Sequence, residues 1–157
     1  MQIIKANLEY ADIVAEIHSK AWKQAYKGIF PSYFLEKESV LKRKREFLDS
    51  CADKNTDYYL IIDDKPVGIV KIKNDENVCE ILSMYILDEA RNKGIGTKTI
   101  QTIVNKYYPK VLVLWTLEQN KSARCFYEKN GFRKVDEERI INRGKDFVQV
   151  KYESFGY

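Results

Sequence analysis

One short turn constrains this fold more than any other part of the chain. It reads Arg91-Asn92-Lys93-Gly94-Ile95-Gly96-Thr97, follows the apolar run Val78–Leu87, and opens a stretch of helical periodicity. The first amides of a helix lack partners within the helix, the helix dipole is positive at that end, and glycine lets an anion approach the backbone. The pattern therefore predicts a strand, an anion-binding turn and a helix, with a diphosphate-bearing ligand at the turn.

The segment before this turn predicts a strand, two helices and three antiparallel strands. One helix face is formed by Tyr10, Ile13, Val14, Ile17 and Ala21, and Gly28 and Pro31 end that helix. Short β-branched and aromatic runs separated by polar turns predict a meander. The expected elements are a strand at 2–5, a first helix from about residue 10, a second helix at 32–50, and strands at 58–62, 67–73 and 78–87.

The segment after the turn predicts a crossover to a buried parallel strand. Residues 88–110 are long enough for a helical crossover, and the apolar run Val111–Trp115 is typical of a central strand. A helix capped by Asn120 follows, then a left-handed turn at Asn130-Gly131 and strands at 132–141 and 146–152. The fold class is therefore α/β (α+β), with a mixed, mostly antiparallel sheet.

Length and composition predict a single domain spanning residues 1–157. No apolar run reaches the roughly 18–20 residues of a membrane span, and the first residues lack a signal-peptide pattern. We therefore expect a soluble cytoplasmic protein without membrane contact. Cys51, Cys79 and Cys125 are odd in number and widely spaced, which favours reduced, mostly buried thiols over disulfides or zinc. The single histidine, His18, is expected to be exposed or half-buried, and no metal centre is expected.

The charge pattern gives little indication of a nucleic-acid partner. The net charge is +4, and the densest basic run is Lys42-Arg43-Lys44-Arg45. Acidic residues flank this run and no aromatic residues interleave with it. A solvated helix face is therefore favoured over a nucleic-acid surface.

Two motifs together point to a known family. The turn at 91–97 lacks the dinucleotide fingerprint and the Gly-Lys-Ser/Thr of a triphosphate loop, but it matches Arg/Gln-x-x-Gly-x-Gly/Ala. A second element reads Asn120-Lys121-Ser122-Ala123-Arg124-Cys125-Phe126-Tyr127-Glu128-Lys129-Asn130-Gly131-Phe132. With the segment Ala21–Pro31, these motifs resemble the GCN5-related N-acetyltransferase (GNAT) superfamily over nearly the whole chain. The resemblance implies about four helices and a sheet that splays apart at its two parallel middle strands.

The resemblance also implies acetyl-CoA as the donor, with direct attack by a substrate amine in a ternary complex. The pantetheine arm would pair with the backbone of Met84, Tyr85 and Ile86, as an added strand does. The diphosphate would be held at the turn by Arg91, Asn92, Lys93, Gly94, Ile95, Gly96 and Thr97. Asn120 would reach the pantetheine or the loop near the sulfur, and Tyr127 would lie near the sulfur.

Tyr127 is the expected general acid in this interpretation. A leaving thiolate needs a proton, and a phenol within about 3 Å can supply it. Tyr127 follows Asn120 by seven residues, or two helical turns, so both side chains can face one ligand. The alternative is that Tyr127 packs as a core aromatic residue beside Phe126.

Glu80 is the candidate general base, acting alone or through water. A carboxylate in so apolar a strand needs a reason, because burying it unpaired is costly. The alternatives are an exposed strand start or an ion pair with Lys71 across the hairpin. Tyr85 has the opposite strand parity and is then a core residue. Trp22 and Tyr26 are expected to line the acceptor pocket with Glu80, with plain packing as their alternative.

The favoured function is N-acetyl transfer to a primary amine of a small molecule, protein or peptide. The alternative is a non-catalytic acyl-CoA-binding or sensing module on the same fold. Cys125 is expected to be a buried apolar residue and not an acyl-enzyme nucleophile. Arg139 and Arg143 near the last hairpin could reach an acidic acceptor, although little in the sequence favours this. A homodimer is possible, and the acceptor stays unidentified.

Overall fold

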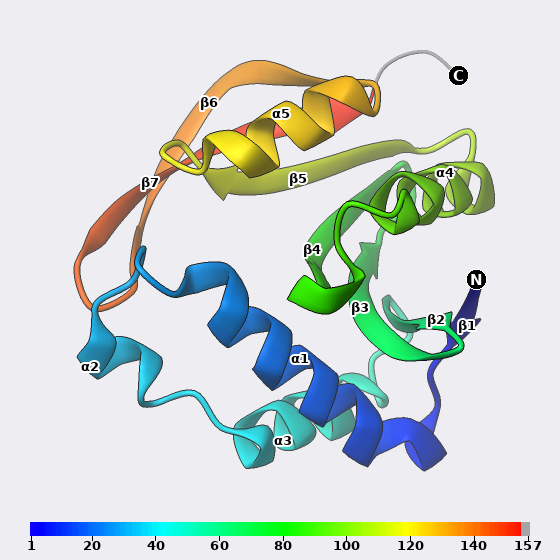
Figure 1. Cartoon of the computed structure of the whole chain (residues 1–157). Helices are drawn as coiled ribbons and strands as arrows, with labels where there is room; N and C mark the ends of the chain where they lie inside the picture. Colours follow the sequence, from blue (N-terminus) through cyan, green and yellow to red (C-terminus); the bar gives the residue numbers. More distant parts are fainter. Residues whose placement is uncertain (155–157) are drawn as a thin grey trace.

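A computed structural model describes residues 1–154, which form one seven-stranded sheet with five α-helices (Figure 1). The strand order is β1-β2-β3-β4-β5-β7-β6. The strands are β1 (Gln2–Lys5), β2 (Thr56–Asp63), β3 (Lys65–Asn74), β4 (Val78–Ile86), β5 (Val111–Leu117), β6 (Phe132–Asn142) and β7 (Asp146–Ser154). The helices are α1 (Ala11–Tyr26), α2 (Ser32–Leu35), α3 (Val40–Ser50), α4 (Ile95–Tyr107) and α5 (Lys121–Lys129).

The sheet carries helices on both faces (Figure 1). On one face, Ile100 of α4 and Phe126 of α5 pack in a cluster that includes Ile61. On the other face, Phe47 of α3 packs with Leu60 and residues of α1. Ile61 and Leu60 are neighbours in β2, and successive strand residues point to opposite faces. The core is therefore divided into two layers by the sheet.

The two middle strands are parallel and separate partway along their length. β4 and β5 pair only from Val78↔Val111 to Ile81↔Leu114. Beyond that point β4 stays paired with β3 as far as Ile86, and β5 stays paired with β7 as far as Leu117. The sheet therefore splays between residues 82–86 and residues 115–117, which confirms the predicted fold.

A β-bulge in β4 changes the direction of the side chains that follow it. Ile81 pairs with Ile72 and Ser83 pairs with Lys71, so Leu82 has no partner in β3. Glu80 pairs with Lys73 and Tyr85 pairs with Ile69, two β3 residues of equal parity. Glu80 and Tyr85 therefore lie on the same face of the sheet. The prediction that they have opposite parity is wrong, because a period-two count does not include the bulge.

The second predicted helix is two helices, so there are five where about four were expected. α2 ends at Leu35 and α3 begins at Val40. Ser39 caps α3, because its Oγ accepts a hydrogen bond from the Lys42 amide at 3.1 Å. No helix of residues 1–154 is long and apolar enough to cross a membrane.

Candidate active site

The gap between β4 and β5 leads to the open N-terminus of α4. Gly94 precedes the helix in a left-handed conformation (φ 77°), and no side chain caps this end. An added Cβ at Gly94 would meet no atom within 4 Å, so the space in front of the helix is open. The first amides of α4, at Ile95, Gly96 and Thr97, need acceptors from outside the helix. These features fit an anion such as a diphosphate.

The two cations of the turn have different surroundings. Arg91 Nε donates to the Ile86 carbonyl oxygen at 3.1 Å, and its Nη1 lies 3.1 Å from Asp88 Oδ1. Lys93 is exposed and forms no ion pair with any residue of the described part of the chain. Arg91 thus fastens the turn to the end of β4, whereas Lys93 is free to approach an anion.

Gly96 has a packing role in addition to its place in the turn. A Cβ at Gly96 would come within 3.0 Å of two ring atoms of Phe126. The absence of a side chain therefore lets the start of α4 lie directly against α5. The sequence motif places both glycines at the phosphate, and the structure gives open space to Gly94 alone.

α5 carries Asn120 and Tyr127 toward the gap. Asn120 Oδ1 accepts from the Ala123 amide at 3.2 Å and so caps the helix. The Tyr127 ring is half-buried, with its centroid 5.3 Å from that of Phe126 and 5.8 Å from that of Phe132. Its hydroxyl makes no hydrogen bond to any residue between 1 and 154. Burial raises the pKa of Tyr127, and the nearby Tyr26 raises it further.

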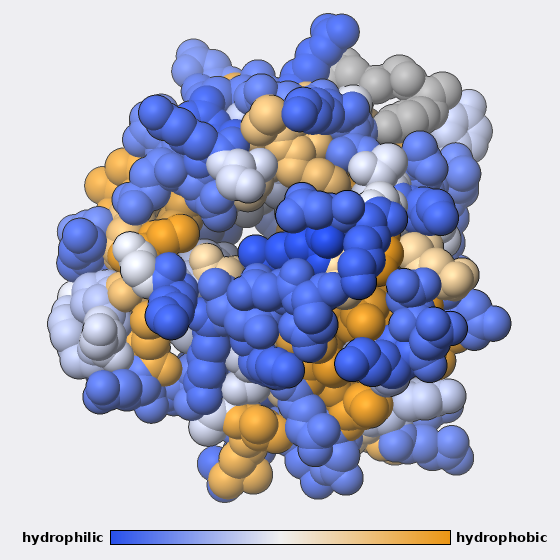
Figure 2. Space-filling view, viewed as in Figure 1, coloured by the Kyte–Doolittle hydropathy of each residue, from blue (hydrophilic) through white to orange (hydrophobic). Residues whose placement is uncertain are grey.

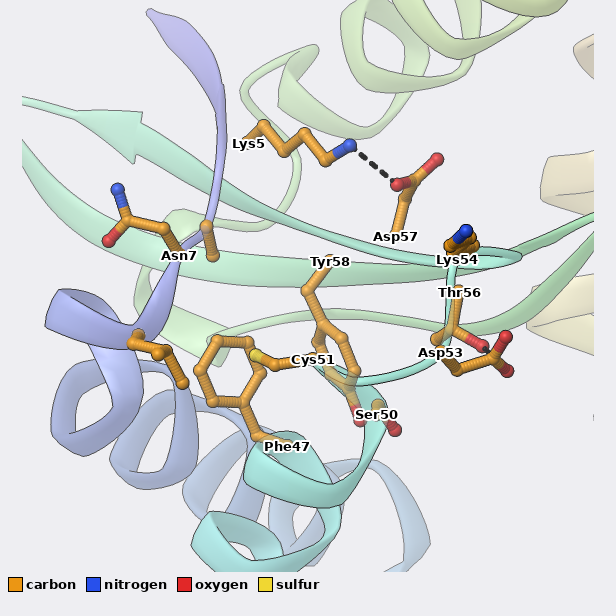
Figure 3. Close-up of a pocket in the computed structure, with 12 residues that line it drawn as sticks. Lys5, Asn7, Phe47, Ser50, Cys51, Asp53, Lys54, Thr56, Asp57 and Tyr58 are labelled. Carbon is orange, nitrogen blue, oxygen red and sulfur yellow. Dashed lines mark hydrogen bonds and ion pairs between the residues drawn. The ribbon is translucent and has the colours of Figure 1, made fainter.

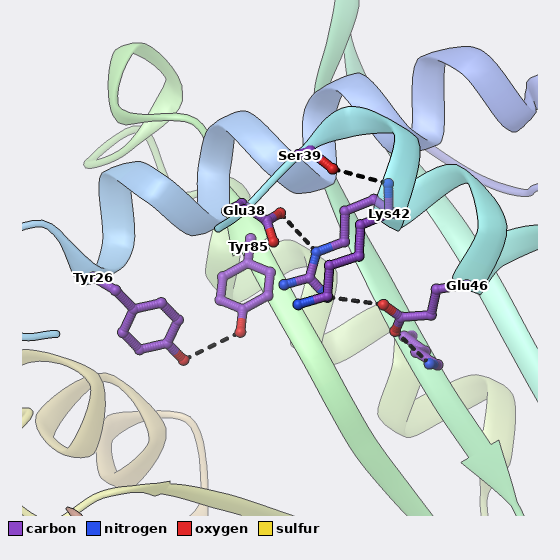
Figure 4. A network of polar contacts seen from close by, with 8 residues as sticks. Tyr26, Glu38, Ser39, Lys42, Glu46 and Tyr85 are labelled. Carbon is purple, nitrogen blue, oxygen red and sulfur yellow. Dashed lines mark hydrogen bonds and ion pairs between the residues drawn. The ribbon is translucent and has the colours of Figure 1, made fainter. Parts of the chain in front are cut away.

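Three tyrosines from three elements gather where β4 and β5 diverge. The hydroxyls of Tyr26 (α1) and Tyr85 (β4) are hydrogen-bonded at 3.1 Å (Figure 4). Burial raises the pKa of both groups, and the charge of an ionised Tyr127 would raise that of Tyr85 further. All three are therefore neutral phenols at ordinary pH. Figure 2 shows a hollow between α1 and α5, the helices that carry Tyr26 and Tyr127.

The sequence did not predict the contact between Tyr26 and Tyr85. The bulge at Leu82 changes the face on which Tyr85 lies relative to Glu80, and an alternating pattern does not show a bulge. Trp22, one turn before Tyr26, is only 7% exposed and packs in a third cluster with Phe30, Leu117 and Phe147. This cluster forms a wall beside the tyrosines.

A charged network lies beside the tyrosines and joins Glu38 and α3 to β3 (Figure 4). Arg43 Nε donates to Glu38 at 2.7 Å, and Arg43 Nη1 donates to Glu46 at 2.9 Å. Lys71 donates to Glu46 at 2.8 Å. Burial opposes ionisation of Glu46, but the Lys71 hydrogen bond and the Lys71 and Arg43 charges outweigh it and lower its pKa to about 2.

This network corrects one prediction and rules out one alternative. Arg43 belongs to it, so the basic run at 42–45 is not wholly a solvated face. Lys71 pairs with Glu46, so it is not the ion-pair partner of Glu80.

His18 is buried, contrary to the expectation of an exposed or half-buried position. It is 2% exposed, and its ring centroid lies 5.5 Å from that of Tyr85. Burial, with the Arg43 charge second, lowers the pKa of His18 to about 3. Its helical spacing indicates this burial, because Val14 and Trp22 lie four residues away on either side and are also buried.

Glu80 lies at the closed end of the gap. It is half-buried, and the Ile81↔Leu114 pair that follows it is the last between β4 and β5. Its carboxylate has no hydrogen bond or ion pair with residues 1–154. Their β3 partners, Lys73 and Ile69, are four positions apart, so Glu80 and Tyr85 lie about 13 Å from each other along the sheet. The structure thus brings the tyrosines together and places Glu80 at the apex.

The cysteines do not follow the expected burial. Cys79 is buried, but Cys51 and Cys125 are exposed. Cys125 lies on the outer side of α5, because the face that carries Phe126 and Tyr127 is turned to the core. Residues 1–154 contain no group of three or more His, Cys, Asp and Glu side chains that could hold a metal ion.

A pocket of about 330 Å³ lies elsewhere, between β1, β2 and α3 (Figure 3). Its lining includes Lys5, Phe47, Cys51, Asp57 and Tyr58. None of the residues expected at the site lines this pocket. Lys5 and Asp57 form an ion pair at 2.8 Å across its rim.

Comparisons with known proteins agree with this geometry. A family model described as an acetyltransferase (GNAT) domain matches residues 54–134. A spermidine N(1)-acetyltransferase of Thermoplasma acidophilum is 30% identical, with 98% of this chain and 99% of the relative covered.

Solved structures show the same fold. The crystal structure of a PaiA N-acetyltransferase from Thermoplasma acidophilum, in complex with coenzyme A, is 26% identical with a TM-score of 0.71, covering 99% of this chain and all of that one. A ribosomal-protein-alanine N-acetyltransferase from Brucella melitensis has a TM-score of 0.76 at 14% identity, over 99% of this chain and 100% of the other. The splayed sheet, the motifs at 91–97 and 120–132 and these matches lead to one conclusion: the chain belongs to the GNAT family of N-acetyltransferases.

Proposed function

We propose that this protein transfers the acetyl group of acetyl-CoA to a primary amine within one ternary complex. The observation that carries the proposal is the separation of β4 from β5 after Ile81↔Leu114. It leaves a free strand edge, with an open helix N-terminus at one end and an unpartnered tyrosine hydroxyl beside it. A similar structure was solved with coenzyme A, which supports the same ligand here.

The residues present fit coenzyme A along this edge. The edge of β4 at Met84, Tyr85 and Ile86 has no strand partner on the β5 side and can pair with an extended amide-bearing arm, although the Ile86 carbonyl oxygen also accepts from Arg91. The amides at the start of α4 and the free ammonium of Lys93 suit a diphosphate. Arg91 adds charge while it holds the turn to β4. When bound, acetyl-CoA supplies an activated thioester and a thiolate leaving group.

Two residues of the chain then transfer protons, Glu80 as the base and Tyr127 as the acid. The amine nitrogen forms a bond to the thioester carbonyl carbon, and the carbon–sulfur bond breaks. Glu80 accepts the proton lost by the amine, directly or through water. Tyr127 gives its proton to the departing sulfur, and its raised pKa keeps it protonated until then. Such general acid catalysis is typically worth about 10²–10⁴ in rate.

Thiol release from acetyl-CoA with a panel of amines tests this function. We expect Tyr127→Phe to lower kcat about 100-fold or more and to change coenzyme A affinity by less than about threefold. Tyr108→Phe is the matched control, because Tyr108 is 67% exposed. An unchanged kcat in Tyr127→Phe would remove Tyr127 from the acid role.

The acceptor is proposed only as a small-molecule amine. The name of one relative makes spermidine a reasonable first compound in the panel. Coenzyme A binding without turnover of any amine would instead favour a non-catalytic acyl-CoA-binding module.

A further inference from the structure

A tryptophan and three polar side chains form two adjacent rows beyond the apex of the gap, on the face of the sheet that α1 and α2 cover. Trp115 of β5 is opposite Lys151 of β7, and Gln149 of β7 is opposite Arg139 of β6. Leu117, two residues after Trp115, belongs to the cluster with Trp22. Because strand side chains alternate, Trp115 points to that same side of the sheet.

Arg139 is held in place with its terminal nitrogens free. Its Cζ lies 4.3 Å from the Trp115 ring centroid, and its Nε donates to Gln149 Oε1 at 2.7 Å. Within residues 1–154, neither Nη atom has a hydrogen bond or a carboxylate within 4 Å. A guanidinium fixed by an aromatic ring and one hydrogen bond loses little entropy when its remaining donors bind a planar anion.

Glu80 offers the opposite charge on the same face. Val113, its partner in β5, is two residues from Trp115, which places the Glu80 and Trp115 Cα atoms about 8 Å apart. Burial lowers the pKa of Arg139, Glu80 is close enough to raise it, and Arg143 lowers it again. Glu80 and Arg139 are therefore near each other without forming a direct ion pair.

The covered face is closed at its outer end. The Tyr33 hydroxyl of α2 donates to the Gly144 carbonyl oxygen in the β6–β7 turn. A Cβ at Gly144 would lie 3.0 Å from Phe34 and 3.1 Å from Pro31, so the two segments are in tight contact. This contact joins α2 to the β6–β7 turn on the side of the sheet that carries Arg139.

We propose that Arg139 and Glu80 hold the two ends of a zwitterion, so that the acceptor is a free α-amino acid. The carboxylate of the acceptor pairs with the Arg139 nitrogens, and its amino group lies against Glu80, beside the apex of the gap. A polyamine is disfavoured, because its other cationic groups would face Arg139 and Arg143. This inference rests on the proposed acetyl transfer.

The test compares amines that differ only in the carboxylate. The acceptors are phenylalanine against phenethylamine and leucine against isoamylamine, with spermidine as the polyamine. We expect kcat/KM for the amino acids to exceed that for the matched amines and for spermidine by about 10–100-fold. Arg139→Gln should raise KM for the amino acid by a similar factor, change kcat by less than about threefold, and leave the matched amine unaffected. Arg45→Gln, at an exposed position of α3, is the control variant.

The outcomes separate this inference from the proposed function. Equal or better turnover of the matched amines or spermidine, with no effect of Arg139→Gln, would overturn the zwitterion site and leave acetyl transfer intact. If no acceptor causes thiol release from acetyl-CoA, the proposed acetyl transfer is wrong. Calorimetry of amino-acid binding to the protein loaded with coenzyme A then tests the role of Arg139. Amino-acid binding that is lost in Arg139→Gln supports the site. Absent binding, or binding that the variant retains, overturns it.

Discussion

At the scale of single residues, the buried imidazole of His18 links stability to pH. The folded protein holds this group neutral with a pKa of about 3, whereas an unfolded chain has a value near 6.5. Below pH 6.5 the unfolded state therefore binds more protons, and stability falls as the pH falls toward 3. Glu46 acts in a lower window, because its pKa is lowered from 4.5 to about 2 and its contribution is lost below pH 4.5.

We expect the free energy of unfolding to drop by about 2 kcal/mol between pH 8 and pH 5 through His18 alone. Denaturant titrations at several pH values would measure this. His18→Gln removes the titrating group, so its slope between pH 7 and 5 should be flatter than that of Glu16→Gln, an exposed control on the same helix. Equal slopes in the two variants would show that His18 does not set this dependence.

Arg43 and Glu38 form the most deeply buried ion pair of the described residues. The Glu38 side chain is 0% exposed and that of Arg43 is 12% exposed. Removing one partner of such a pair leaves a buried charge, which typically costs about 3–5 kcal/mol, whereas replacing both can be nearly neutral. We expect Arg43→Met to destabilise strongly and the double variant with Glu38→Met to recover most of the loss. Chemical denaturation checks this, and additive losses would contradict it.

At the scale of elements, the contact between α2 and the β6–β7 turn should control access to the acceptor side. Gly144 has φ 86°, and a Cβ there would press on Pro31 and Phe34. We expect Gly144→Ala to destabilise by about 1–2 kcal/mol and to raise KM for the acceptor more than KM for acetyl-CoA. Gly28→Ala is a matched control, because Gly28 has φ 80° and open space around it. If both variants shift the acceptor KM equally, the contact itself has no role.

Some of these elements could be predicted from the sequence and others could not. The strands and the turn before α4 were predictable, because apolar runs and glycines mark their limits. The bulge at Leu82 was not, because it depends on how β3 pairs with β4, and a local pattern does not record pairing. Ser39 was a visible cap signal, but the polar residues around it also fit a continuous helix. Because the bulge was not predicted, the contact between Tyr26 and Tyr85 was not predicted either.

At the scale of the whole molecule, the sheet consists of two halves that meet at few positions. Between β4 and β5 the pairs run only from Val78↔Val111 to Ile81↔Leu114. On one face, Gly96 and Phe126 bring α4 and α5 together. On the other face, α2 reaches the β6–β7 turn. A ligand along the free edge of β4 would therefore bridge the two halves.

Hydrogen exchange tests this bridging directly. The amides of Ile95, Gly96 and Thr97 lack partners within α4 and should exchange fast in the free protein. At coenzyme A concentrations near 100 times Kd, we expect these amides to slow by about 100-fold, together with free-edge amides of residues 84–86. The turn at residues 63–65 joins β2 to β3, which lie on the side of β4 away from the gap, and its amides should change little. If exchange slowed at residues 95–97 but not at residues 84–86, only the diphosphate would be held. Such a result would contradict the proposal that the pantetheine arm lies in the gap between β4 and β5.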